Sequence, residues 1–159
     1  MLTAAHCAAA SGETKIAELN AAKLYGLADV TEAAAQPQYT GREWPAPDLA
    51  LSKLSQSLPR APVFLTMRPV VVGERLIIVG YGIAERDDSR TVGTPRMAML
   101  TVSQQSAAVL TLVDRLSKIG GCLGDSGAPA LAMRGGVPAL ESHQSLRRPH
   151  IRHPPRHKW

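Results

Sequence analysis

Frequent glycine and proline residues divide this sequence into short segments, and this division limits the folds that the chain can adopt. The 159 residues include 13 Gly and 12 Pro. Between these turn-forming residues the apolar segments are short, as in Glu74–Tyr81 (ERLIIVGY), Pro95–Val102 and Ala128–Met133. Short strands separated by turn signals are typical of a sandwich or a barrel of antiparallel strands. We therefore predict an all-β fold.

Four further segments complete the expected secondary structure. Asp48–Leu54 (DLALSKL) alternates apolar and polar residues and Ala107–Val113 is a short apolar run, so both are expected to be strands. Lys15–Val30 fits a helix by its composition or two short strands by its local alternation, and the sequence leaves both open. Thr31–Pro47 contains three prolines and is expected to be a loop.

The positive charge of the chain is concentrated at one end. Lys and Arg outnumber Asp and Glu by 18 to 13, a formal charge of +5, which by itself invites a nucleic-acid or anionic-surface partner. Residues 1–140 carry 13 basic and 12 acidic side chains, whereas residues 141–159 carry five basic side chains against Glu141. This second segment is rich in Arg, His and Pro without a hydrophobic period, so we expect a disordered tail.

The composition excludes several other classes of protein. The tail has no aromatic residue apart from Trp159, so anion or nucleic-acid binding by it is kept only as an alternative, and no nucleic acid is expected as a partner. Its four histidines are irregularly spaced across prolines, so no metal is expected. Two cysteines, Cys7 and Cys122, exclude a disulfide-dense miniprotein and a four-cysteine zinc module. No apolar run approaches the roughly 18 residues of a membrane span, so no membrane partner is expected.

The segment GDSGAP, Gly124–Pro129, has the composition of a catalytic loop. Glycines on both sides of Asp125–Ser126 allow backbone angles that are closed to other residues and a close approach of a substrate carbonyl. A serine in such a loop can present its hydroxyl beside two backbone N–H donors, which is what an oxyanion hole requires. A turn uses the same residue types for structural reasons, so this string alone leaves both interpretations open.

Two residues far from this loop favour the catalytic interpretation. His6 is the only histidine outside residues 141–159, and histidine is the side chain whose ordinary pKa suits a general base near neutral pH. Asp48 stands at the entrance of an expected strand, where an aspartate caps a turn or orients an imidazole. With Ser126, the order along the chain is His, Asp, Ser, which is one of the known orders of such a triad.

Four segments in this order resemble the trypsin-like serine proteases, in particular a bacterial member. They are LTAAHC, DLALSKL, the glycine-tyrosine-glycine run that begins at Gly80, and GDSGAP, and the similarity covers residues 1–140. The resemblance implies a chymotrypsin-like fold of two antiparallel β-barrels and a serine endopeptidase that cleaves proteins or peptides without a cofactor. It assigns His6 as the general base, Asp48 as its orienting partner and Ser126 as the nucleophile.

The resemblance also assigns roles to the residues around this serine. Gly124 and Ser126 would supply the two N–H donors of the oxyanion hole. Gly120 falls at the base of the specificity pocket, and because it carries no carboxylate, a preference for Arg or Lys is not expected. Asp125 resembles the residue that pairs, in the family, with the amino terminus made by zymogen cleavage. The segment carrying that terminus is missing, so Asp125 is expected to lack a partner.

Measured against the family, the chain is expected to be incomplete. Residues 1–58 would be a remnant of the first barrel and residues 59–140 most of the second, with a truncated N-terminus and a tail (141–159) that a reading-frame shift would explain. Cys7 and Cys122 would both have lost their usual disulfide partners and are not expected to bond to each other. Family members are secreted or periplasmic, although no signal peptide precedes LTAAHC.

The missing strands bear on activity. Exposed strand edges and a partly exposed interior would leave this chain poorly folded and weakly active, because the stability of an intact domain is only about 5–15 kcal/mol. A non-catalytic fragment that binds protein partners is therefore the alternative to an active endopeptidase.

Overall fold

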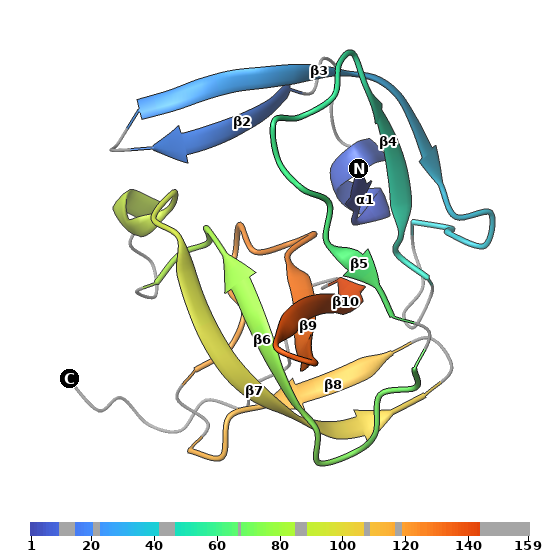
Figure 1. Cartoon of the computed structure of the whole chain (residues 1–159), viewed down its shortest axis with the longest axis vertical. Coiled ribbons are helices and arrows are strands. Elements are labelled where there is room, and N and C mark those ends of the chain that lie inside the picture. Colours follow the sequence, from blue (N-terminus) through green and yellow to red (C-terminus); the bar gives the residue numbers. More distant parts are fainter. Residues whose placement is uncertain are drawn as a thin grey trace.

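The structure, a computed structural model, forms two β-sheets, one above the other in Figure 1. It describes residues 1–9, 15–20, 23–41, 47–66, 68–84, 89–106, 109–116 and 119–143. Most of the predicted tail, from residue 144 onward, lies outside the described residues. Within the described part of the chain, no helix is long and apolar enough to cross a membrane.

The first sheet has four antiparallel strands in the order β1-β4-β3-β2. Its elements are β1 (Leu2–Thr3), helix α1 (Ala5–Ala9), β2 (Lys15–Asn20), β3 (Lys23–Ala35) and β4 (Ala50–Leu54). Of the two structures left open for residues 15–30, the chain adopts the pair of strands. The loop expected from Thr31 is wrong for its first five residues, because β3 continues to Ala35 and pairs there with β4. Those five residues are exposed, so no apolar period marks them as a strand.

The second sheet has six strands in the order β5-β10-β9-β6-β7-β8. They are β5 (Phe64–Leu65), β6 (Arg75–Gly80), β7 (Arg96–Gln105), β8 (Leu110–Val113), β9 (Pro129–Arg134) and β10 (Val137–His143), and a 3-10 turn, η1 (Ser89–Thr91), precedes β7. All neighbours are antiparallel except β5 and β10, which run parallel. The strands predicted at 74–81, 95–102, 107–113 and 128–133 are confirmed within a few residues as β6, β7, β8 and β9.

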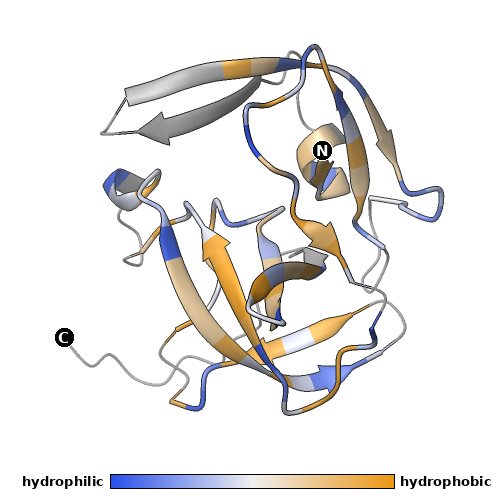
Figure 2. Ribbon diagram, viewed as in Figure 1, coloured by the Kyte–Doolittle hydropathy of each residue, from blue (hydrophilic) through white to orange (hydrophobic). Residues whose placement is uncertain are grey.

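The core lies on one face of the second sheet. Leu76 and Val102 are fully buried, and they pack with five further buried side chains, Val70, Ile78, Leu100, Ala130 and Ala132. In Figure 2, β6 is drawn mostly in orange, as one of the most apolar segments of this sheet. Burial at alternate residues of β6 and β9 reflects the two-residue period of a strand with one covered face.

The predicted all-β fold is confirmed as a mostly β structure of two sheets, whereas the predicted barrels are not formed, because neither sheet closes among the described residues. Closure requires the two edge strands of a sheet to bond to each other. In the second sheet the edge strands are β5 and β8, which remain apart in the strand order. Phe64 and Leu65 of β5 are each 70% exposed, so this edge is open to solvent.

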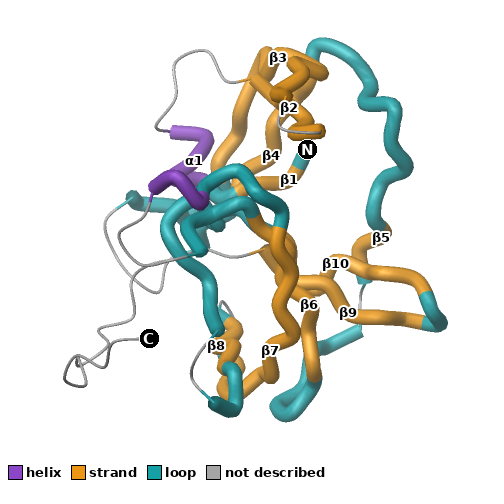
Figure 3. Tube along the Cα trace, turned by 90° about the vertical axis from the view of Figure 1, so that its left-hand side faces the viewer, coloured by secondary structure: helices purple, strands orange, loops and turns teal. Residues whose placement is uncertain are grey.

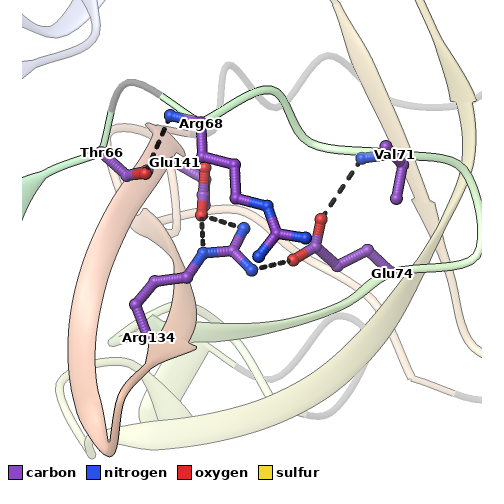
Figure 4. A network of polar contacts seen from close by, with 6 residues as sticks. All are labelled: Thr66, Arg68, Val71, Glu74, Arg134 and Glu141. Atoms are coloured by element: carbon purple, nitrogen blue, oxygen red, sulfur yellow. Dashed lines mark hydrogen bonds and ion pairs between the residues drawn. The ribbon is translucent and has the colours of Figure 1, made fainter.

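An arginine joins strands β9 and β10 to the turn that precedes β6 (Figure 4). Arg134, at the end of β9, lies 2.5 Å from a carboxylate oxygen of Glu74 and donates from Nε to Glu141 of β10 at 2.8 Å. The Glu141 side chain is only 1% exposed, so the ion pair compensates a buried charge. β10 thus continues three residues past Leu140, where the composition of the sequence changes.

We expect the melting temperature to fall as the pH is lowered, and Glu74→Gln to weaken this dependence. The hydrogen bond from Arg134 lowers the pKa of Glu74. Its ionised form therefore stabilises the fold above the ordinary glutamate pKa, about 4.3, and this contribution is lost as the pH falls through the lowered pKa of the folded protein. Thermal unfolding followed by circular dichroism between about pH 3 and pH 6 measures both slopes.

The matched control is Glu32→Gln. Glu32 pairs with Lys53, but both side chains are 68% exposed, and an exposed pair of this kind contributes little. The melting temperature of Glu32→Gln should depend on pH as that of the unmodified protein does. The same pH dependence for Glu74→Gln would contradict the stabilising role of the Glu74–Arg134 pair.

Candidate active site

His6 and Asp48 are brought together by the pairing of two strands. His6 lies in α1, just after β1, and Asp48 lies just before β4. β1 and β4 are antiparallel neighbours, with Leu2 opposite Leu51 and Thr3 opposite Ala50. The segment that leaves β1 and the segment that enters β4 therefore meet at the same end of the sheet. The sequence-predicted pair is in direct contact.

Asp48 holds both the main chain and the ring of His6. Its Oδ1 accepts the His6 backbone N–H at 2.8 Å, and its Oδ2 lies 2.5 Å from His6 Nδ1. Its side chain is 9% exposed, whereas that of His6 is 38% exposed. Because a carboxylate only accepts, Nδ1 carries the proton in this bond, and in the neutral ring Nε2 is then the acceptor. Nε2 is thus the ring nitrogen suited to take up a proton.

Cys7 lies between this imidazole and the loop that carries Ser126. Its Sγ is 3.5 Å from His6 Nε2 and donates to the backbone oxygen of Ser126 at 3.7 Å. Burial, followed by the negative charge of Asp48, raises the pKa of the Cys7 thiol, which keeps it protonated. Both Cys7 and Cys122 are free cysteines in the structure.

We call residues 120–128 the serine loop, and it packs against the start of the chain. A Cβ built on Gly127 would lie 2.9 Å from Thr3 Oγ1 and 3.4 Å from Ala4 N, and the φ of Gly127 is +83°. Figure 3 shows α1 beside the loops of the second half of the chain. The structure thus brings Ser126 to the segment of His6. Between these two described residues no side-chain hydrogen bond is formed, and such bonds often tighten only when substrate binds.

Two N–H groups of the serine loop are open to an incoming acceptor. Asp125 N donates to Cys122 O at 3.1 Å, and Ala128 N donates to Asp125 O at 2.9 Å. Among the described residues, the N–H groups of Gly124 and Ser126 donate to no protein group. These are the two predicted oxyanion donors, and the positive φ of Gly124, +93°, sets the turn between them.

The expectation that Asp125 lacks a partner is wrong. Its Oδ1 accepts from Gly82 N at 2.7 Å and its Oδ2 from Cys122 N at 2.9 Å. The ammonium group of Met1 donates elsewhere, to Ser52 O at 2.6 Å. Sequence reasoning missed this arrangement because both donors are backbone groups, which carry no side-chain signal.

The Asp125 carboxylate fills the space left by the absent side chains of Gly80 and Gly82, and we call this space its seat. A Cβ on Gly80 would overlap Asp125 Oδ1, and a Cβ on Gly82 would lie 2.6 Å from Asp125 Cγ. Real Cβ atoms do not approach so closely, so the carboxylate occupies the space that side chains would take at these positions. The glycine-tyrosine-glycine run, noted in the sequence only as a point of resemblance, is therefore a packing requirement.

Gly120 lines a cavity of about 250 Å³. The same cavity is lined by Asp125 and by apolar side chains of β6 and β7, including Ile78 and Leu100. Among the described residues, no atom beyond the chain neighbours of Gly120 lies within 4 Å of a Cβ built on it, so this position has open space in front of it. The described residues contain no group of three or more potential metal ligands.

Comparisons with known proteins agree with this fold. A sequence model of the trypsin family matches residues 1–149. Among 188 matching chains of solved structures is neuropsin, a serine protease expressed in the limbic system of mouse brain. It superimposes with a TM-score of 0.67 at 20% identity, over 88% of this chain and 68% of the neuropsin chain. At that identity the likeness shows the fold. A search of curated proteins gave no match.

We expect Gly80→Ala to destabilise the protein by about 1–3 kcal/mol, because the new methyl group must displace the Asp125 carboxylate from its seat. Gly120→Ala is the matched control, since its methyl group meets nothing, and it should stay within about 0.5 kcal/mol. Urea unfolding of the three proteins measures the difference. Equal urea midpoints for Gly80→Ala and Gly120→Ala would show that the Asp125 carboxylate does not require a glycine at position 80.

Proposed function

We propose, since this chain belongs to the trypsin family of serine proteases, that it is a serine endopeptidase using His6, Asp48 and Ser126. The observation that carries the proposal is the hydrogen bond between Asp48 and His6, with 2.5 Å between Oδ2 and Nδ1. This contact leaves Nε2 as the acceptor on the side where the serine loop lies. Protein or peptide substrates follow from the same family membership.

The proposed reaction uses Ser126 as the nucleophile. His6 Nε2 takes the proton of Ser126 Oγ as this oxygen attacks the carbonyl carbon of the scissile peptide bond. Asp48 stabilises the imidazolium that results. When the C–N bond breaks, the imidazolium returns the proton to the leaving amine, and an acyl group remains on Ser126. Attack by water, with His6 again as the base, releases the acid and restores the hydroxyl.

The oxyanion formed in each attack needs donors that are already in place. The N–H groups of Gly124 and Ser126 meet this need, because no other group of the described chain uses them. Removal of one such donor in an acyl-transfer enzyme typically slows catalysis by about 10²–10³-fold. All groups in this scheme belong to the chain, so the reaction requires no cofactor.

The substrate preference is proposed from Gly120. By family resemblance this residue lies at the base of the pocket for the side chain that precedes the scissile bond. A glycine there offers open space and no charge. The pocket should therefore accept uncharged side chains and should not favour Arg or Lys.

Ser126→Ala should abolish labelling by a fluorophosphonate probe and peptidase activity together, because the probe and the substrate both react with Oγ. Labelling is followed by mass spectrometry of the tryptic peptide that contains residue 126. Ser57→Ala is the control, since Ser57 is an exposed serine outside the site. If Ser126 in the unmodified protein takes up no probe, the endopeptidase proposal fails and the non-catalytic alternative stands.

Gly120→Asp should shift cleavage toward peptides with Arg or Lys before the scissile bond, because a carboxylate in the pocket would pair with the cation. The ratio of kcat/KM for Arg and Leu peptides is expected to rise about tenfold or more relative to the unmodified protein. An unchanged ratio would place Gly120 outside the specificity pocket.

A further inference from the structure

The serine loop is attached to the second sheet through a short backbone bridge, residues 81–84. Gly82 N donates to Asp125 Oδ1 at 2.7 Å, and Ile83 N donates to Leu123 O at 2.8 Å. Gly124 packs on the same bridge, because a Cβ on it would lie 3.1 Å from Gly82 Cα. The N–H groups of Gly82 and Ile83 therefore hold the loop that carries Ser126, whereas Ala84 N donates to Thr91 Oγ1 at 2.9 Å.

The opposite, carbonyl side of the bridge is held by residues 91–96, which we call the support segment. Gly93 N donates to Tyr81 O at 2.8 Å, and Arg96 Nη1 donates to Gly82 O at 3.3 Å. Two successive peptide groups are thus bonded on both sides, with their N–H groups to the serine loop and their C=O groups to the support segment. Hydrogen bonds in such chains polarise and strengthen one another.

Arg96 is the charged member of this arrangement. The same Nη1 atom also lies 2.9 Å from Thr91 O and 3.2 Å from Thr94 O, so the guanidinium gathers three carbonyl oxygens. A guanidinium presents its donors in a fixed planar geometry and makes charge-assisted bonds, which are stronger than neutral ones. Within the described residues it forms no ion pair, so its donors serve the backbone.

We propose that Arg96 is a positioning residue for Ser126, acting through the Gly82–Ile83 peptide on the serine loop. This inference rests on the proposed endopeptidase function for its kinetic consequence. Without the guanidinium, the Gly82 carbonyl loses its donor, and the peptide group is held on one side only, by the bond from Ile83 N to Leu123 O, which weakens. The nucleophile and its two oxyanion donors then lose their fixed orientation. A displacement of about 1 Å at a reacting centre costs about 10²-fold in rate.

The test compares Arg96→Met, Arg96→Gln and Arg96→Lys in the full chain. Order in the serine loop is read from the rate at which iodoacetamide alkylates Cys122, resolved from Cys7 by peptide mass spectrometry. We expect Arg96→Met and Arg96→Gln to raise the Cys122 rate about tenfold relative to the unmodified protein. Arg96→Lys keeps the charge and one donor to the bridge, and should recover part of the effect.

The kinetic readout separates positioning from substrate binding. Arg96→Met should lower kcat and the rate of fluorophosphonate labelling at Ser126 by about 10–100-fold, with KM within about threefold of the unmodified value. Arg75→Met is the matched control, since Arg75 is an exposed arginine of β6 without a side-chain hydrogen bond in the described part of the chain. It should change neither rate.

Three outcomes would overturn the inference. The first is an unchanged Cys122 alkylation rate in both Arg96→Met and Arg96→Gln. The second is a rise in KM with kcat unchanged, which would make Arg96 a substrate-binding residue. The third is an equal effect in Arg75→Met. If the unmodified protein takes up no probe at Ser126, the endopeptidase proposal fails, whereas the Cys122 rates still decide whether Arg96 holds the loop.

Discussion

The pairing of β1 with β4 is the constraint on which the geometry of the site depends. Beyond the strands themselves, the ammonium group of Met1 donates to Ser52 O, and Ser52 N donates to Met1 O at 2.8 Å. This ladder fixes the segment after β1 against the segment before β4. His6 and Asp48 lie on these two segments, 42 residues apart in the sequence, and their contact follows from the register of the strands.

The part of the site that carries Ser126 is held in place by contacts other than strand pairing. The serine loop owes its position to backbone donors around the half-buried carboxylate of Asp125, and it meets the first half through the close packing of Gly127 on Thr3 and the thiol of Cys7. Each half is therefore fixed by its own hydrogen bonds, and the two meet along a narrow contact beside Ser126. Chemistry at this contact depends on both halves at once.

The sequence was most informative where turn-forming residues bound short apolar segments. The strands around Ile78, Leu100 and Ala130 were predicted on this basis. The last residues of β3 were not predicted as a strand because they are exposed. The end of β10 was not predicted because the composition changes near residue 140. Glu141 is buried there because it pairs with Arg134, a contact that the sequence does not reveal. The partners of Asp125 and the part played by Arg96 could not be foreseen, since both involve main-chain atoms that every residue possesses.

The seat of Asp125 makes three positions in the sequence dependent on one another. Glycine is needed at positions 80 and 82 only while position 125 carries a side chain that fills the space between them. A smaller residue at 125 would leave a void that an alanine at 80 or 82 could occupy, so single changes would be harmful where paired changes compensate. In the evolution of this protein the three positions should therefore vary as a set, and the free energies of their substitutions should not add.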